Sequence, residues 1–240
     1  MGEAFAWGAI GASALLIGAL VSYAFAPSQR VIAVVMALGS GVLIGSVSFE
    51  LIDEALKTRT VAWVALLTLV GAGVFAAGDL ILDRRGGSER KDPSGKQATG
   101  APLAIVLGSV LDGIPESFVL GLTLIQGGVS LPILAGILLS NFPEGMASSS
   151  GLRAAGWPSR IVMVMWGGVA LVSAVAAAAG FALLDPASGR TGALVQAFAA
   201  GALLAMITDT LLPEAYAVEG PVTGLLVVAG FALSLALAAI

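Results

Sequence analysis

Two Pro-Glu pairs, Pro115-Glu116 and Pro143-Glu144, lie inside two neighbouring apolar segments of the chain. A carboxylate near the middle of a bilayer costs roughly 2.5–3.5 kcal/mol, and a proline there removes a hydrogen bond from the helix. A proline kink alone is common in membrane helices and does not require a glutamate beside it. We therefore interpret the two pairs as parts of one ion-binding site.

Each of these two segments offers oxygen ligands one helical turn apart. Asp112 and Glu116 are spaced i, i+4 in the first segment, and Ser140 and Glu144 have the same spacing in the second. Asn141 precedes Glu144 by three residues. Residues at these spacings share one face of a helix. We expect these five residues to form the binding site of a transported cation.

Three carboxylates on adjacent helices repel one another strongly at low dielectric. Asp112, Glu116 and Glu144 are compatible with burial if a cation neutralises them or if they hold protons. Each proline also leaves the carbonyl four residues earlier, at Leu111 or Leu139, available to a water molecule or an ion. The pattern indicates ion or proton traffic, and a buried structural network is the alternative interpretation.

Further acids lie towards the ends of two other apolar segments. Glu50 and Asp209 are the deeper ones, and we predict that they act as entry and exit ligands. Asp53, Glu54 and Glu214 fit a role as ligands and a role as solvated helix ends equally well.

The chain contains no cysteine and no histidine. Disulfides, haem ligation by histidine, and histidine-dependent protease sites are therefore excluded. A metal site must be built from carboxylates, amides, hydroxyls, carbonyls, methionine sulfur and water, a set that suits hard cations better than thiolate-preferring ones. We expect no resident cofactor, with a divalent cation as the transported substrate.

The composition is that of a polytopic membrane protein, because 58% of the 240 residues are hydrophobic and only 11% are charged. Eight stretches are long enough to cross about 30 Å of hydrocarbon as helices. We predict a single transmembrane domain over residues 1–240, with spans at 4–26, 31–56, 61–82, 103–125, 131–152, 161–183, 191–212 and 222–240.

Basic residues predict the orientation of these spans. Eight of the eleven lysines and arginines fall on one side, which places that side in the cytoplasm and both termini outside a cell membrane. The segment 84–102, rich in Gly, Ser and charge, is predicted to be a flexible cytoplasmic loop. Asp79 lies just before it and is predicted to be interfacial. A nucleic-acid partner is not expected, since the basic residues are accounted for by topology.

Internal similarity predicts inverted repeats. The second span contains GVLIGSVSFELIDEA from Gly41, and the seventh contains GALLAMITDTLLPEA from Gly201, matched at one offset of 160 residues. These two spans run in opposite directions across the membrane, as in many transporters. The motifs LDGIPES and LSNFPEG of the fourth and fifth spans form a second matched pair. We expect spans one to three and six to eight to be repeats around a proline-kinked central pair.

These motifs resemble those of the ZIP metal-ion transporters, whose fourth and fifth helices carry HNxPEG and a related (H/Q)(N/D/E)xPEG. The resemblance covers all eight spans in order, including the family's second and seventh helices, which end in HLLPEA or a similar sequence. It implies an all-α fold of eight transmembrane helices. It also implies that the transport-site ligands are Asp112, Glu116, Ser140, Asn141 and Glu144.

The departures from the family pattern concern the metal ligands. Asp112 stands where the fourth-helix motif has its His, Gly113 where it has Asn, and Ser117 where it has Gly. Ser140 replaces the fifth-helix His or Gln. The sixth span contains no acid and offers only Ser173 near the depth at which some members add a glutamate. A two-metal site and a preference for zinc are therefore not implied.

The expected function is transport of a divalent cation, such as Zn, Mn, Fe or Cd ions, into the cytoplasm, with the lipid bilayer as the surroundings and a homodimer as a plausible assembly. A proton-linked carrier of another small solute is the alternative. An intramembrane aspartyl protease using Asp112 and Asp209 is a remote one, because the GxGD motif of that family is absent. No other enzyme activity is expected.

Overall fold

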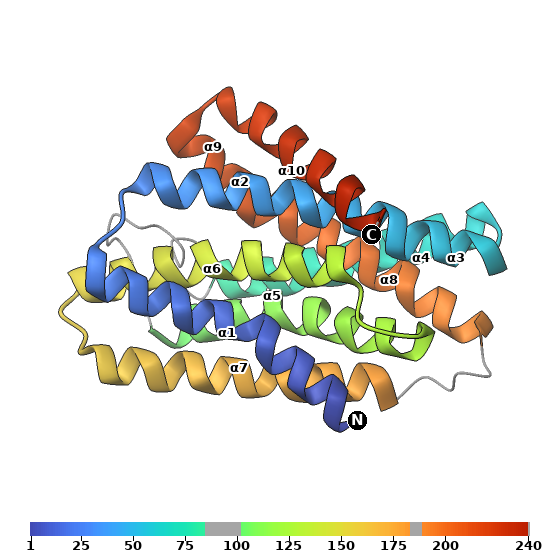
Figure 1. Cartoon of the computed structure of the whole chain (residues 1–240), viewed down its shortest axis with the longest axis horizontal. Helices are drawn as coiled ribbons and strands as arrows, with labels where there is room; N and C mark the ends of the chain where they lie inside the picture. Colours follow the sequence, from blue (N-terminus) through green and yellow to red (C-terminus); the bar gives the residue numbers. More distant parts are fainter. Residues whose placement is uncertain (85–101, 183–188, 240) are drawn as a thin grey trace.

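The computed structural model describes residues 1–84, 102–182 and 189–239, and these residues form an all-helical bundle (Figure 1). Nearly all of the predicted loop 84–102 lies outside the described residues. Contiguous elements join into eight long helical segments within the described ranges. The prediction of an all-α protein is confirmed.

Four of the eight segments form the first part of the chain. The first is α1 (Gly2–Phe25), and the second joins α2 (Gln29–Ser46), η1 (Val47–Ile52) and α3 (Asp53–Thr58). The third is α4 (Val61–Leu82), and the fourth is α5 (Pro102–Thr123), followed by the short η4 (Leu124–Gln126).

The remaining four segments complete the bundle. They are α6 (Leu131–Ala154), α7 (Ser159–Ala182), the joined α8 (Gly189–Met206), η5 (Ile207–Leu211) and α9 (Leu212–Glu219), and finally α10 (Val222–Ala238). Side chains fix some of the starts: Ser28 and Ser130 each accept a hydrogen bond from a main-chain N–H in the first turn of α2 and α6.

Six of the segments are long and apolar enough to cross a membrane, judged on the described residues. The other two are α6, which carries Ser140, Asn141, Glu144 and three serines at 148–150, and α10, which has 17 residues. The chain is thus a multi-pass membrane protein. The polar content of α6 is the reason why it does not meet the same standard, although it packs inside the bundle.

Eight glycines, one on each long segment, join the segments into four close pairs. A Cβ added to any of them would collide with a main-chain carbonyl oxygen of the partner helix. That carbonyl always belongs to the residue three positions before the partner's own glycine, so every contact is reciprocal. The pairs are Gly18 with Gly145 (α1 and α6), Gly180 with Gly121 (α7 and α5), Gly41 with Gly230 (α2 and α10), and Gly201 with Gly71 (α8 and α4).

Paired helices run in the same direction. In Figure 1, α1 and α6 both run from right to left, whereas α5 and α7, like α2 and α10, run from left to right. Small residues at such crossings let the two backbones approach, which favours association where no hydrophobic effect operates between helices. The glycine contacts thus determine which helices pair and at which residues along its length each helix crosses its partner.

The largest apolar cluster fills the region where α2, α5, α6 and α8 converge. Leu43, Leu120, Ile137 and Met206 are almost completely buried there. A second cluster lies between α1 and α7 around Trp166, whose indole N–H donates a 2.8 Å hydrogen bond to the hydroxyl of Ser149. Interior polar atoms of this kind need such partners.

Two π-helical turns interrupt the second and seventh segments. They are η1 (Val47–Ile52) and η5 (Ile207–Leu211), and each contains an acid, Glu50 or Asp209. They begin six residues after Gly41 and Gly201, respectively. π-Helical turns occur frequently at functional sites. The two sequences that the internal similarity aligned therefore share an unusual local conformation.

The glycine contacts predict a sharp difference between two neighbouring substitutions on α4. Gly71→Ala places its methyl group against the carbonyl of Phe198, and we expect a loss of about 1–3 kcal/mol in stability from the resulting strain. Gly73→Ala meets nothing within 4 Å, so it should be neutral or stabilise by up to about 1 kcal/mol through helix propensity. Thermal unfolding in detergent measures both, and equal midpoints for the two variants would refute the prediction.

Candidate functional site

The predicted site residues lie on α5 and α6, near the centre of the bundle. Pro115 and Pro143 are inside these helices, and each helix continues through its proline. Asp112, Glu116 and Glu144 are 2%, 2% and 3% exposed. All three predicted carboxylates are therefore buried inside the bundle.

Glu116 and Ser140 meet across the interface between α5 and α6. The Ser140 hydroxyl lies 3.0 Å from Glu116 Oε1 and 3.1 Å from the carbonyl of Ile137 on its own helix. Both side chains are buried. The structure therefore brings together two of the five predicted ligands, one from each Pro-Glu helix.

A second bond of the same kind joins Ser109 to Glu144. The Ser109 hydroxyl on α5 donates a 2.7 Å hydrogen bond to Glu144 Oε1 on α6, and Ser109 is buried. Sequence reasoning missed Ser109, although its spacing carries a signal. It precedes Asp112 by three residues and Glu116 by seven, so all three share one face of the helix. Each glutamate thus accepts a hydrogen bond from a serine hydroxyl of the opposite helix.

Asn141 and Gly113 connect the site to α1 and α7. The Asn141 amide donates a 3.3 Å hydrogen bond to the carbonyl of Gly11 in α1. On the other side, a Cβ at Gly113 would lie 3.0 Å from the Ser173 hydroxyl of α7. Asn141 is thus satisfied by main chain in this conformation, while Ser173 packs directly against the backbone beside Asp112.

Buried hydroxyl groups continue along α6 past the site. Past Glu144, α6 carries Ser148 and Ser149, both fully buried. In the opposite direction, the facing positions of α5 and α6 are apolar and buried, with Leu120 at 0%, Ile133 at 2% and Ile137 at 1% exposure. Apolar side chains therefore lie next to the Glu116–Ser140 contact on the side of η4, before the buried hydroxyl of Thr123 at the end of α5, and serine hydroxyls line α6 past Glu144.

The glycine contacts also define which positions of α5 and α6 correspond. Gly121 and Gly145 make equivalent contacts, with α7 and α1 respectively. Counting five residues back from each glycine equates Glu116 with Ser140. The match of the two motifs in the sequence aligns Glu116 with Glu144 instead. In three dimensions, the contact between Glu116 and Ser140 joins equivalent positions.

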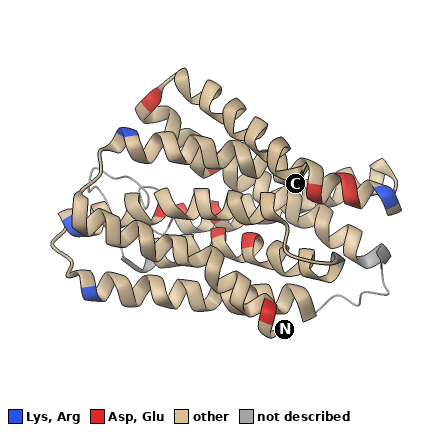
Figure 2. Cartoon of the chain, in the orientation of Figure 1, with Lys and Arg blue, Asp and Glu red and all other residues tan. Residues whose placement is uncertain are grey.

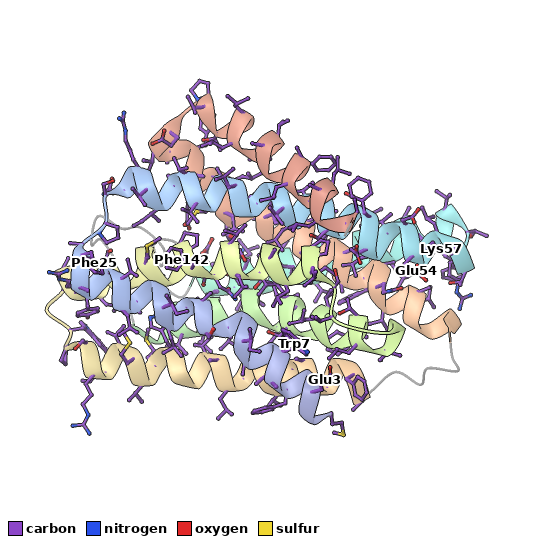
Figure 3. The ribbon with its side chains drawn as sticks, in the orientation of Figure 1. Glu3, Trp7, Phe25, Glu54, Lys57 and Phe142 are labelled. Carbon is purple, nitrogen blue, oxygen red and sulfur yellow. The ribbon has the colours of Figure 1, made fainter. Side chains whose placement is uncertain are left out.

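The acids predicted at the ends of the path lie apart from this centre. Glu50 is half-buried in η1, and Asp209 is exposed in η5. Asp53 and Glu54 form ion pairs of 3.8 and 2.6 Å with Lys57 at the end of the second segment, where Figure 3 labels Glu54 and Lys57. Such exposed pairs contribute little to stability.

Two other acids are more enclosed than their sequence positions indicated. Asp79, predicted to be interfacial, is only 9% exposed on α4. Glu214 lines a small pocket between α2, α6 and α9, together with Met36 and Ala147. Position in the sequence gave no sign of this enclosure, because it depends on which neighbouring helices cover each residue.

Figure 2 shows acidic segments within the middle of the bundle as well as at its ends. Over the residues that the structure describes, no group of three or more acidic side chains is gathered closely enough to hold a metal ion. The two serine–glutamate bonds join α5 and α6 at this centre. No protein-family model matches the chain, and comparison with curated proteins found no match.

The bond between Ser109 and Glu144 predicts a stability difference between two serine substitutions. Ser109→Ala removes a buried hydrogen bond to a carboxyl group, and we expect a loss of about 1–3 kcal/mol. Ser13→Ala is the control, because the Ser13 hydroxyl donates only to a carbonyl of its own helix. Its effect should stay within about 0.5 kcal/mol. Chemical or thermal unfolding measures both, and a neutral Ser109→Ala would contradict the assigned bond.

Proposed function

We propose that the protein is a divergent ZIP-like transporter that moves a divalent metal cation into the cytoplasm through a site on α5 and α6. The observation that carries the proposal is the pair of hydroxyl–carboxyl bonds, Ser140 to Glu116 and Ser109 to Glu144, buried between two helices of a membrane protein. Buried carboxyl groups at such depth are expensive and usually functional.

The side chains around these bonds supply the ligands that the proposal requires. Asp112, Glu116 and Glu144 would replace part of the hydration shell of the ion, and Ser109, Ser140 and Asn141 would add neutral oxygens. Hard divalent cations prefer such ligands. In this proposal, ion binding draws the three carboxylates together and the serine hydroxyls turn their lone pairs to the ion.

An inverted repeat is part of the proposal, with α1 to α4 as one copy and α7 to α10 as the other. Three observations support it. Gly41 and Gly201, aligned by the sequence, make equivalent backbone contacts with α10 and α4. The π-helical turns η1 and η5 occupy corresponding places. In Figure 1, α1 and α7 run in opposite directions, as do α2 and α8.

The proposed path follows from this arrangement and from the distribution of basic residues. Glu50 would attract the ion from outside, the central carboxylates would hold it, and Asp209 would receive it on the cytoplasmic side, with both termini outside the cell membrane. Rocking of one repeat against the other around the site would alternate the access. The glycine crossings of α2 with α10 and of α4 with α8 join the two repeats, so such a movement would have to shift these close contacts.

A proton-linked carrier is the second candidate. The bonds from Ser109 and Ser140 satisfy carboxyl oxygens without a metal, which suits groups that exchange protons. An aspartyl protease is not favoured, because Asp112 is buried whereas Asp209 is exposed. Catalytic aspartates of that class share a proton at short distance.

Transport measurements test the proposal directly. Purified protein in proteoliposomes should take up divalent metals saturably, and the double variant Glu116→Gln, Glu144→Gln should lose at least about 90% of that uptake because amides cannot neutralise the ion. The control is Glu3→Gln, an exposed acid at the start of α1, away from the centre (Figure 3).

Each outcome separates the two candidates. Uptake that saturates with metal and disappears only in the double variant supports a metal transporter. Proton movement that depends on the same glutamates, with no metal uptake between about pH 5 and 8, would replace the metal transporter by the proton-linked carrier.

A second prediction concerns metal selectivity. Asp112→His introduces a nitrogen ligand at the position where the ZIP motif has histidine, and imidazole suits Zn²⁺ better than Mn²⁺. We expect the ratio of zinc to manganese uptake to rise by about tenfold, a ligand effect of about 1.4 kcal/mol. Competition between the two metals measures this ratio. An unchanged ratio would argue that Asp112 does not contact the ion.

A further inference from the structure

A pocket separate from the carboxylate site opens between the last turns of α1 and α6. Its volume is about 330 Å³, and it opens to the surroundings of the protein. It is lined by Ser22, Ala26, Pro27, Ser150, Arg153 and Ala154. We call it the Arg153 pocket.

Arg153 is fixed in this pocket by the end of α1. Its Nη1 donates a 2.7 Å hydrogen bond to the carbonyl of Ser22. A helix C-terminus carries partial negative charge, so it holds the guanidinium but does not cancel its full charge. Among the described residues, no carboxylate forms an ion pair with Arg153, since the pairs found involve Arg30 and Lys57. The pocket therefore presents a positioned positive charge.

Two hydroxyls complete the polar lining. The Ser22 and Ser150 hydroxyl oxygens lie 2.9 Å apart, with Ser22 1% exposed. A guanidinium has five N–H donors in a planar fork, and one of them is used by the Ser22 carbonyl. The two hydroxyls are hydrogen-bonded to each other, so at most one of their protons is available to a ligand. That hydroxyl and the remaining N–H groups of the guanidinium fork form a donor set that recognises phosphate oxygens. The chemistry of the pocket fits a phosphate anion.

The place of the pocket in the fold indicates the source of that phosphate. It lies at the last turns of α1, which is long and apolar enough to cross a membrane, and of α6. Lipid headgroups begin at the ends of such membrane-spanning helices. Tyr23 follows Ser22 in the chain, and its hydroxyl donates a 2.7 Å hydrogen bond to the carbonyl of Trp157, three residues after Ala154. Two aromatic residues of the kind enriched at membrane interfaces thus lie next to pocket residues in the sequence. Basic pockets between membrane helices commonly bind anionic headgroups. We propose that the Arg153 pocket binds the phosphate of an anionic phospholipid.

Lipid titration of the purified full-length chain in non-ionic detergent tests this proposal. Dioctanoyl phosphatidylglycerol should raise the thermal unfolding midpoint saturably, and dioctanoyl phosphatidylcholine should raise it much less. Arg153→Gln should increase the half-saturating phosphatidylglycerol concentration at least about tenfold, because a charge-assisted hydrogen bond is lost. Arg160→Gln, which removes an exposed cation in the first turn of α7, should leave it unchanged.

A second variant guards against a merely structural effect of Arg153. Ser150→Leu keeps the arginine but fills the pocket, and it should weaken the response to phosphatidylglycerol as well. The proposal is overturned if Arg153→Gln responds like the parent, or if both lipids act alike. A saturable response to inorganic phosphate without one to phosphatidylglycerol would also overturn it, because the site would then serve a soluble anion.

Discussion

Close contact between glycine and a partner's main-chain carbonyl is the constraint on which the rest of this structure depends. Lipid tails are as apolar as leucine, so helices in a membrane gain little from burying hydrocarbon against one another. They must instead fit closely. Each of the eight segments contributes one glycine to a reciprocal contact of this kind, and Gly39 of α2 also lies against the carbonyl of Leu139 in α6. The four pairs that result fix the crossing points of the bundle, and the remaining side chains fill the space between them.

The candidate site depends on two of these pairs. Gly145 locks α6 to α1, and Gly121 locks α5 to α7. With both helices held from outside, their inner faces meet at Glu116 and Ser140, and again at Ser109 and Glu144, two turns along α5 and one turn along α6. The same packing explains why Asn141 reaches a carbonyl of α1. The polar centre is thus positioned by apolar contacts at its outer sides.

Much of the fold could be predicted from the sequence, because apolar length and internal similarity are local properties of the chain. The eight helical segments, the burial of Asp112, Glu116 and Glu144, and the likeness of the regions after Gly41 and Gly201 all follow from such patterns. The partners of the carboxylates could not be predicted in the same way. Matching the two Pro-Glu motifs aligned Glu116 with Glu144, whereas packing makes Glu116 equivalent to Ser140.

The exposure of the acids near the helix ends could not be predicted from the sequence either. Asp79 and Asp209 are both single acids near one end of an apolar segment, yet the first is buried and the second is exposed. The difference lies in which neighbouring helix covers each side chain. Spacing along one helix defines a face, but it does not state what lies opposite that face. Ser109 shows the same limit, since its role depends on α6.

Equivalent positions of α5 and α6 hold a carboxylate on one side and a hydroxyl on the other. The glycine contacts of the two helices match, so their packing alone does not distinguish one end of the bundle from the other. The side chains next to the centre do distinguish the two ends: Ser148 and Ser149 follow Glu144 along α6, whereas Leu120 and Ile137 lie on the other side of the contact. The buried carboxylates therefore have hydroxyl groups as neighbours towards one end of the bundle and hydrocarbon towards the other, so the centre is polarised along the helix axes although the packing around it is matched.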